Sequence, residues 1–157
     1  MEQEKYLGVH AQKTRETTIH VQTVRVLANV RIMFKLIIAG GRDFNNYDGM
    51  SKCLDRLLKN INDNIEIVCG MARGADRLGE RYAKEHGYKV IYMPADWDLY
   101  GKSAGFKRNA QMAEYADALV AFWDGVSSGT KHMIETAQNM GLDVRVKKYL
   151  MVKKDST

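Results

Sequence analysis

From residue 33 onward, the chain alternates short apolar runs with longer amphipathic stretches, and this alternation restricts the fold more than any other feature. The apolar runs resemble buried strands, and the stretches between them carry apolar residues at helical spacing. The expected strands are residues 34–39, 65–69, 89–93, 118–123 and 144–150, and the expected helices are residues 47–61, 74–86, 103–115 and 129–140. Strands that alternate with helices predict an α/β fold, a three-layer α/β/α sandwich around a mostly parallel sheet of about five strands.

The loops that follow the first four expected strands each join small residues to charged or polar ones. They are residues 40–44, 70–76, 95–97 together with 100–105, and 124–130. In sheets of this class, ligands bind beyond the carboxyl ends of the strands, near the point where the strand order reverses. We therefore expect the functional site there. Gly40 and Gly41 would let the backbone turn sharply under a ligand, and Arg42 and Asp43 are either ligand contacts or an ion pair that braces the loop.

The 157 residues suffice for one ordinary domain with a substantial core. Residues 1–32 show no clear helical stripe, so we expect a loosely ordered or atypical extension there and a compact domain over residues 33–157. No apolar run approaches the ~18 residues that a membrane helix needs, and no signal peptide is visible. We expect a cytoplasmic protein in which Cys53 and Cys69 are reduced buried thiols.

The chain carries a net charge of +5, which suits an anionic partner without requiring one. Basic residues gather from Arg145 to the end, where Lys147, Lys148, Lys153 and Lys154 follow. A solvated edge strand and tail is the simpler interpretation, because lysines discourage pairing between sheet edges. A nucleic-acid contact is the alternative. The histidines are scattered without the spacing of metal ligands, so we expect no metal and no cofactor.

Two of the loops contain patterns typical of phosphate or nucleotide sites. Ser128, Gly129 and Thr130 open an expected helix, whose free N–H groups and dipole attract anions. An ordinary helix cap is the alternative, although neither Ser128 nor Thr130 is followed by the acidic or amide residue of a capping box. Gly70 and Gly74 form a GxxxG pattern, which on its own is weak evidence for a nucleotide site. Asp76 either bonds a ribose or stabilises a first helical turn.

Arg108 shares a helical stripe with apolar residues that face the sheet. An arginine there either extends to solvent or requires an anion in the cleft. Because Lys102 and the turn at residues 128–130 lie at the same end of the sheet, an anionic ligand is the simpler explanation. Trp97 and Trp123 are more simply core residues, with a base-stacking platform as the alternative.

Taken together, the loops resemble those of the SLOG superfamily, and most closely its YspA/YpsA-related branch, which is common in bacteria and phages. The resemblance rests on IIAGGRDF (37–44), GMARGAD (70–76), ADWDLYGKSAGFKRNAQM (95–112), ADALVAFWDG (116–125) and SSGT (127–130). Each motif is weak alone, but their order and spacing are fairly specific. The resemblance implies a Rossmann-like fold that binds a nucleotide or nucleotide-derived ligand at the carboxyl ends of the strands.

More distant members are DNA-processing protein A and the Lonely Guy phosphoribohydrolases, which cleave the base from a nucleoside monophosphate. Arg108 and Asn109 match their Arg-Lys pair, with Asn in place of Lys. Residues 116–118 match the Ala-Asp pair that precedes one of their strands. Their catalytic Glu, three residues after a Gly-Thr turn, is Met133 here. Glu135 lies two residues further, which turns its side chain about 200° around the helix. The catalytic carboxylate of that group is therefore expected to be missing.

The leading hypothesis is binding of a nucleotide-like small molecule by a sensor or handling protein. The first alternative is an N-glycoside hydrolase of nucleotides, with Arg108, Asp124 and Asp96 as candidate catalytic residues and Asp43 as a further carboxylate. The second alternative is binding of single-stranded nucleic acid. No membrane partner is expected, and a homo-oligomer stays open. The candidate ligand-binding residues are Gly40, Gly41, Arg42, Asp43, Gly70, Ala72, Gly74, Asp76, Asp96, Trp97, Lys102, Arg108, Asn109, Asp124, Ser128, Gly129 and Thr130.

Overall fold

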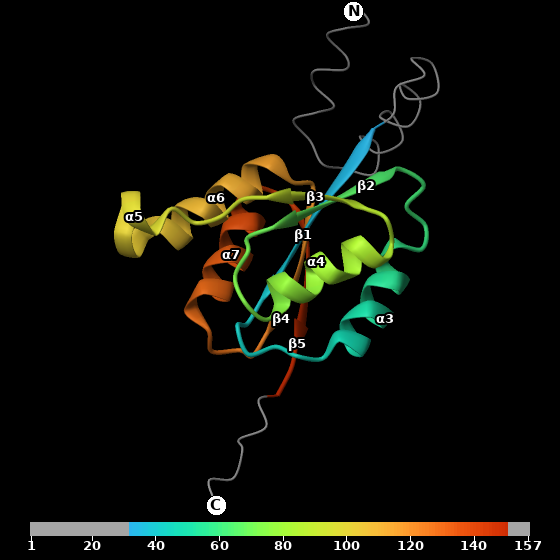
Figure 1. Cartoon of the computed structure of the whole chain (residues 1–157), viewed down its shortest axis with the longest axis horizontal. Helices are drawn as coiled ribbons and strands as arrows, with labels where there is room; N and C mark the ends of the chain where they lie inside the picture. The colour runs from blue at the N-terminus through green and yellow to red at the C-terminus, as the bar shows by residue number, and fades with distance from the viewer. Residues whose placement is uncertain (1–31, 151–157) are drawn as a thin grey trace, which may run out of the picture. The chain divides into compact units, whose positions relative to one another are not determined.

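The computed structural model describes residues 32–150 of the chain. Five strands form one parallel sheet: β1 (Met33–Gly40), β2 (Asn64–Cys69), β3 (Lys89–Tyr92), β4 (Ala118–Trp123) and β5 (Asp143–Lys148). Their order in the sheet is β3-β2-β1-β4-β5 (Figure 1). The order reverses between β1 and β4, so this pair marks the point where ligands bind in sheets of this class.

Helices cover both faces of the sheet, as Figure 1 shows. They are α3 (Tyr47–Leu58), α4 (Ala75–Glu85), the short α5 (Trp97–Tyr100), the 3₁₀ turn η1 (Gly101–Ser103), α6 (Ala104–Tyr115) and α7 (Ser128–Asn139). One face packs against α3 and α4, and the other packs against α6 and α7. The predicted Rossmann-like three-layer fold with a sheet of five strands is confirmed.

The central strands are buried on both faces, which explains their uninterrupted apolar sequences. In β1, Leu36 and Ile38 pack into the core below α3 and α4, whereas Ile37 packs into the core below α6 and α7. Successive side chains of a strand point to opposite faces, so a run without alternation fills both cores. The last strand, β5, lies at the sheet edge and exposes Arg145 and Lys147, in agreement with the edge-strand interpretation.

Several predicted boundaries differ from the structure. The first helix ends at Leu58 rather than at residue 61, and the last strand ends at Lys148 rather than at residue 150. The loop expected at residues 95–97 and 100–105 contains α5, because the Asp96 carboxylate caps this turn by accepting a hydrogen bond from Leu99 N (3.0 Å). Helix α4 ends at Glu85, one residue before the predicted end, and Gly87 follows it with a left-handed φ of 71°, as is typical after a helix.

Three further expectations concern the whole chain. The atypical extension predicted over residues 1–32 falls almost entirely on residues 1–31, which lie outside the described residues, so it stays a prediction. Both cysteines are free thiols; Cys69 is buried, whereas Cys53 is only half-buried. Within residues 32–150, no helix is long and apolar enough to cross a membrane.

Candidate functional site

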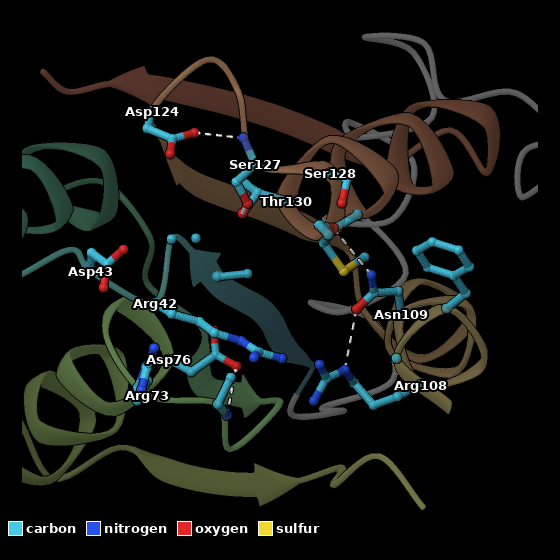
Figure 2. A pocket seen from close by; sticks show the side chains of 18 of the residues that line it. Arg42, Asp43, Arg73, Asp76, Arg108, Asn109, Asp124, Ser127, Ser128 and Thr130 are labelled. Atoms are coloured by element: carbon cyan, nitrogen blue, oxygen red, sulfur yellow. Dashed lines mark hydrogen bonds between the residues drawn. The ribbon is translucent and has the colours of Figure 1, made fainter. Parts of the chain in front are cut away.

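A cleft of about 500 Å³ opens at the carboxyl ends of β1 and β4, where the strand order reverses. The loops after β1, β2 and β4 and the first turns of α6 and α7 line it (Figure 2). Its volume lies within the usual range for small-ligand sites, roughly 300–1,000 Å³. The cleft therefore lies where the sequence predicted a site.

The β1 loop owes its two glycines to close contacts within the protein. A Cβ atom on Gly40 would collide with the carbonyl oxygen of Phe122, and one on Gly41 would collide with the hydroxyl of Tyr149. Gly41 also bonds to β4, since its N–H donates to Phe122 O (3.0 Å). The glycines thus let the end of β1 pack against β4 and the segment after β5.

Next in this loop, Arg42 and Asp43 both line the cleft and are exposed. Within residues 32–150 no ion pair joins them, so the alternative of a bracing ion pair is wrong. Figure 2 shows the Arg42 side chain extending across the cleft towards Arg108, while Asp43 points elsewhere. Both groups are therefore free to meet a ligand.

Asp76 is a buried carboxylate at the start of α4, with 5% of its surface exposed. It accepts a hydrogen bond from Ala72 N (3.1 Å) and thereby holds the β2 loop closed. Burial raises the pKa of Asp76 to about 6, while the Ala72 hydrogen bond and the nearby charges of Arg108 and Arg42 oppose this shift. Asp76 lines the cleft, but its hydrogen bond goes to the loop.

Gly74 connects the β2 loop to the β1 loop. Its φ of 78° is left-handed, and a Cβ there would collide with Gly41 O. The adjacent Ala75 N donates to the same carbonyl oxygen (3.1 Å). The two loops therefore form one packed unit, and Gly74 supports the cleft without lining it.

Arg108 enters the cleft from α6 and is held from two sides. Its Nη1 donates to Gly70 O, and its Nε donates to Asn109 Oδ1 (3.2 Å). Burial lowers the pKa of Arg108, and the neighbouring Asp76 carboxylate opposes this effect. A carbonyl and an amide leave the positive charge of the guanidinium without direct neutralisation. This arrangement agrees with the predicted need for an anion.

Asn109 is buried and joins the arginine to α7. Its Nδ2 donates to Gly129 O (3.4 Å) and lies 3.2 Å from His132 Nδ1. The ring of His132 stacks on Phe106, at 4.2 Å between ring centroids. Asn109 therefore fixes Arg108 relative to the first turn of α7 on the opposite wall of the cleft.

The β4 loop presents the N-terminus of α7 to the cleft. Asp124 Oδ1 accepts hydrogen bonds from Val126 N and Ser127 N, both at 2.8 Å, and these bonds lower the pKa of Asp124. Ser127 occupies the N-cap position, but its side chain bonds to Thr130 Oγ1 (3.2 Å) and caps no backbone N–H. The first turn of α7 thus lacks a side-chain cap and faces the cleft.

The two tryptophans have different roles. Trp97 is 51% exposed and lines the cleft, so its interpretation as a core residue is wrong. Trp123 packs partly against the core, and its Nε1 donates to Ser127 O (3.0 Å), which supports the β4 loop from behind. Its interpretation as a core residue is confirmed.

A second cleft of about 430 Å³ adjoins the first at the ends of β2 and β3. Arg42, Ala72, Arg73, Trp97 and Arg108 line both clefts. Four further residues line the second cleft but not the first: Gly70, Met71, Pro94 and Ala95. The arginines therefore stand at the junction of two clefts.

Most of the predicted residues meet in the first cleft. Gly70 lines only the second cleft, and Gly74 and Asp96 line neither. Fourteen predicted residues line the first cleft: Gly40, Gly41, Arg42, Asp43, Ala72, Asp76, Trp97, Lys102, Arg108, Asn109, Asp124, Ser128, Gly129 and Thr130. Among the lining residues missed by sequence are Arg73, Phe106, Ser127 and Tyr149. Arg73 lies in the loop of residues 70–76, which the sequence had already indicated as part of the site. Nothing in the sequence around Tyr149 indicated a site.

Tyr149 is the least expected of these residues. Its hydroxyl is buried and has no hydrogen-bond partner among residues 32–150. Burial and the nearby carboxylates of Asp124 and Asp43 raise its pKa. The tyrosine packs edge-on against Phe44, with ring centroids 4.9 Å apart. It closes the end of the cleft next to Gly41.

No candidate for a catalytic glutamate or a metal centre emerges from the described residues. Glu135 is exposed and lies 3.9 Å from Lys131 Nζ on the surface of α7, in agreement with the expected rotation away from the cleft. No group of three histidine, cysteine or acidic side chains within residues 32–150 could hold a metal ion. The carboxylates that line the first cleft are Asp43, Asp76 and Asp124.

The fold and the cleft define a Rossmann-like α/β protein with an arginine-rich cleft at the switch point of its sheet. Residues 34–100 match the family described as YspA, cpYpsA-related SLOG. The chain is 34% identical over 118 residues to the Gene 61 protein of Mycobacterium phage D29, covering 71% of this chain and 94% of that protein. The chain belongs to the SLOG superfamily, in its YspA/cpYpsA-related family.

The fold is also similar to the X-ray structure of DNA processing protein A from Streptococcus pneumoniae, with a TM-score of 0.59. The likeness covers 77% of this chain but only 52% of that chain, at 18% identity, so it concerns the fold alone. Membership of the SLOG superfamily supports a role related to nucleotides or nucleic acids.

Proposed function

We propose that this protein binds a nucleotide or a nucleotide-derived small ligand in the first cleft, as a sensor or handling protein. One observation carries the proposal: Arg42, Arg73 and Arg108 line the cleft together with the uncapped N-terminus of α7. Guanidinium groups bind phosphate in a bidentate manner, and helix N-termini attract anions. A phosphorylated ligand would meet both.

The arginines are available for such a ligand. Within residues 32–150, none of the three forms an ion pair with a carboxylate, and Arg42 and Arg73 are exposed. Arg108 is partly buried, and burial of a charge is costly unless a partner compensates for it. A ligand phosphate would compensate for this cost and neutralise like charges that repel each other.

Titration calorimetry of the full chain with adenine, guanine and pyrimidine nucleotides tests the proposal. We expect binding of at least one nucleotide, and we expect Arg42→Ala to weaken it about tenfold, the usual value of one charge-assisted contact. Arg56→Ala is the matched control, because Arg56 is exposed in the last turn of α3 and lines neither cleft. Equal affinities of the two variants would exclude the cleft as the site.

Hydrolysis of the N-glycosidic bond of a nucleotide is a second candidate function. Asp43 favours it, since this carboxylate lines the cleft and makes no hydrogen bond or ion pair within the described residues. A carboxylate in that position could stabilise an oxocarbenium-like transition state. Of the other candidates, Asp96 caps α5 outside the cleft, and Asp124 binds the backbone of its own loop. Release of free base that Asp43→Asn abolishes would establish this activity.

Binding of single-stranded nucleic acid is a third candidate. The protein of similar fold, DNA processing protein A, is named for DNA, and the arginines at the junction of the clefts suit a phosphate backbone. Such binding loses affinity steeply with salt, because each neutralised phosphate releases counterions. An affinity for a short single strand that exceeds the affinity for mononucleotides and falls steeply with salt would favour this function.

A further inference from the structure

The two clefts share their most basic residues, and this sharing bears on the size of the ligand. Arg42, Arg73 and Arg108 line both clefts, together with Trp97 and Ala72. The junction therefore concentrates positive charge between two separate spaces of about 500 and 430 Å³. Each space alone is large enough for a small ligand.

Beyond the junction, different residues line the two spaces. The first cleft adds polar groups, including Asp43, Asp124 and the open turn of α7. The second cleft adds apolar surface from Met71, Pro94 and Ala95. Trp97 stands between them with half of its surface exposed, so its ring is available for stacking by a base.

Arg108 is fixed at this junction by one contact on each side. It donates to Gly70 O, whose residue lines the second cleft, and to Asn109 Oδ1, whose residue lines the first. The two contacts hold the guanidinium group of Arg108 at the boundary between the two clefts. An anion bound there would have room for a substituent on each side.

We propose that the ligand is a dinucleotide, in which two nucleosides are joined by a phosphate or pyrophosphate bridge. The bridge lies on the arginines, one nucleoside occupies the first cleft, and the other occupies the second cleft against Trp97. This inference rests on the proposed function and extends it from a nucleotide-like ligand to a two-part ligand. A mononucleotide would fill the first cleft and leave the second empty.

Titration calorimetry of the full chain compares AMP with NAD, ADP-ribose, the dinucleotide pApA and a ten-residue oligodeoxyadenylate. We expect a two-part ligand to bind about tenfold or more tightly than AMP, because the second contact forms at high effective concentration. Tighter binding of NAD or ADP-ribose identifies a pyrophosphate bridge. Tighter binding of pApA or the oligonucleotide identifies a phosphodiester bridge.

A variant in the second cleft tests where the additional affinity arises. Ala95→Phe places a ring in the second cleft, and we expect it to lower the affinity for the two-part ligand to about that for AMP, while AMP binding stays within about twofold. Leu99→Phe is the matched control, since Leu99 lies on neighbouring α5, is 67% exposed and lines neither cleft. We expect this control to bind all ligands as the unmodified chain does.

Three outcomes would overturn the inference. If every two-part ligand binds the unmodified chain no more tightly than AMP does, the second cleft contributes nothing, and the proposed function still stands. If the additional affinity persists in folded Ala95→Phe, the second nucleoside lies elsewhere. If none of these ligands binds and no guanine or pyrimidine nucleotide binds either, the proposed function fails together with the inference. If Ala95→Phe does not fold, the ratio of affinities in the unmodified chain alone decides.

Discussion

Asp76 combines two opposing requirements in one side chain. It must be ionised to accept the Ala72 hydrogen bond well and to attract Arg42 and Arg108, yet it is almost completely buried. Burial disfavours the charged form and raises the pKa to about 6. The folded state therefore binds a proton more tightly than the unfolded chain does, so this residue should lower stability as the pH rises from about 4 to 6.

We expect Asp76→Asn to remove this dependence on pH. The asparagine keeps an oxygen acceptor for Ala72 N but carries no charge. Relative to the unmodified chain, the free energy of unfolding of the variant should rise by about 2 kcal/mol between pH 4 and pH 7, since one pKa unit corresponds to about 1.4 kcal/mol and the unfolded carboxyl is already partly ionised at pH 4. Denaturant unfolding at both pH values measures this difference. A difference that is the same at both pH values would show that Asp76 titrates normally.

The N-terminal turn of α7 is the element on which the anion site depends most directly. Gly129 is exposed in this turn, and a Cβ added there would meet no atom within 4 Å. A substitution at Gly129 therefore changes the charge of the site without disturbing the packing. A negative side chain at a helix N-terminus even stabilises the helix, by roughly 0.3–1 kcal/mol.

We expect Gly129→Asp to keep or raise the melting temperature while it weakens nucleotide binding about tenfold or more, because the carboxylate repels the phosphate. Gly129→Ala is the matched control, since it adds a methyl group without charge and should bind nearly as the unmodified chain does. Thermal unfolding and calorimetry on the same samples separate stability from affinity. Equal affinities of the two variants would mean that no phosphate binds at this turn.

The sequence predicted the central strands but missed the short helix α5. The apolar runs of β1 and β4 predicted central parallel strands, because strands buried on both faces leave a strong sequence signal. The four-residue helix α5 was missed, since it is too short to show a periodic pattern and depends on the cap at Asp96. Trp97, the first residue of α5, had the core as its simpler interpretation and a base-stacking platform as the alternative. Short elements of this kind are decided by single hydrogen bonds.

The sequence predicted those residues of the candidate site that directly follow a strand. It did not predict residues that other parts of the chain bring to the cleft. Gly40–Asp43 and residues 128–130 were found because the carboxyl ends of parallel strands meet at one edge of the sheet. Tyr149 reaches the cleft from the segment after β5, and its contact with Gly41 joins residues far apart in the chain. The role of Asp76 was left open by the sequence, because burial and partner atoms decide it.

On the scale of the whole molecule, the described fold contains its own core. Among the described residues, both hydrophobic clusters consist of residues between Phe34 and Tyr149. The first strand, β1, occupies the centre of the sheet between β2 and β4, so its apolar side chains are covered on both faces by helices that follow it in the chain. We therefore propose that residues 33–157 form the folding unit and that residues 1–32 are an extension to it.

A chain that begins at Met33 tests this proposal. We expect it to unfold cooperatively within about 4 °C of the full chain, a shift that corresponds to roughly 1 kcal/mol at this size, and to bind nucleotide with the same affinity. The physical reason is that every side chain in the two clusters and in both clefts is retained. Limited proteolysis of the full chain gives an independent readout, with cleavage expected first within residues 1–32. Equal resistance to cleavage along the whole chain, or failure of the shortened chain to fold, would make residues 1–32 part of the domain.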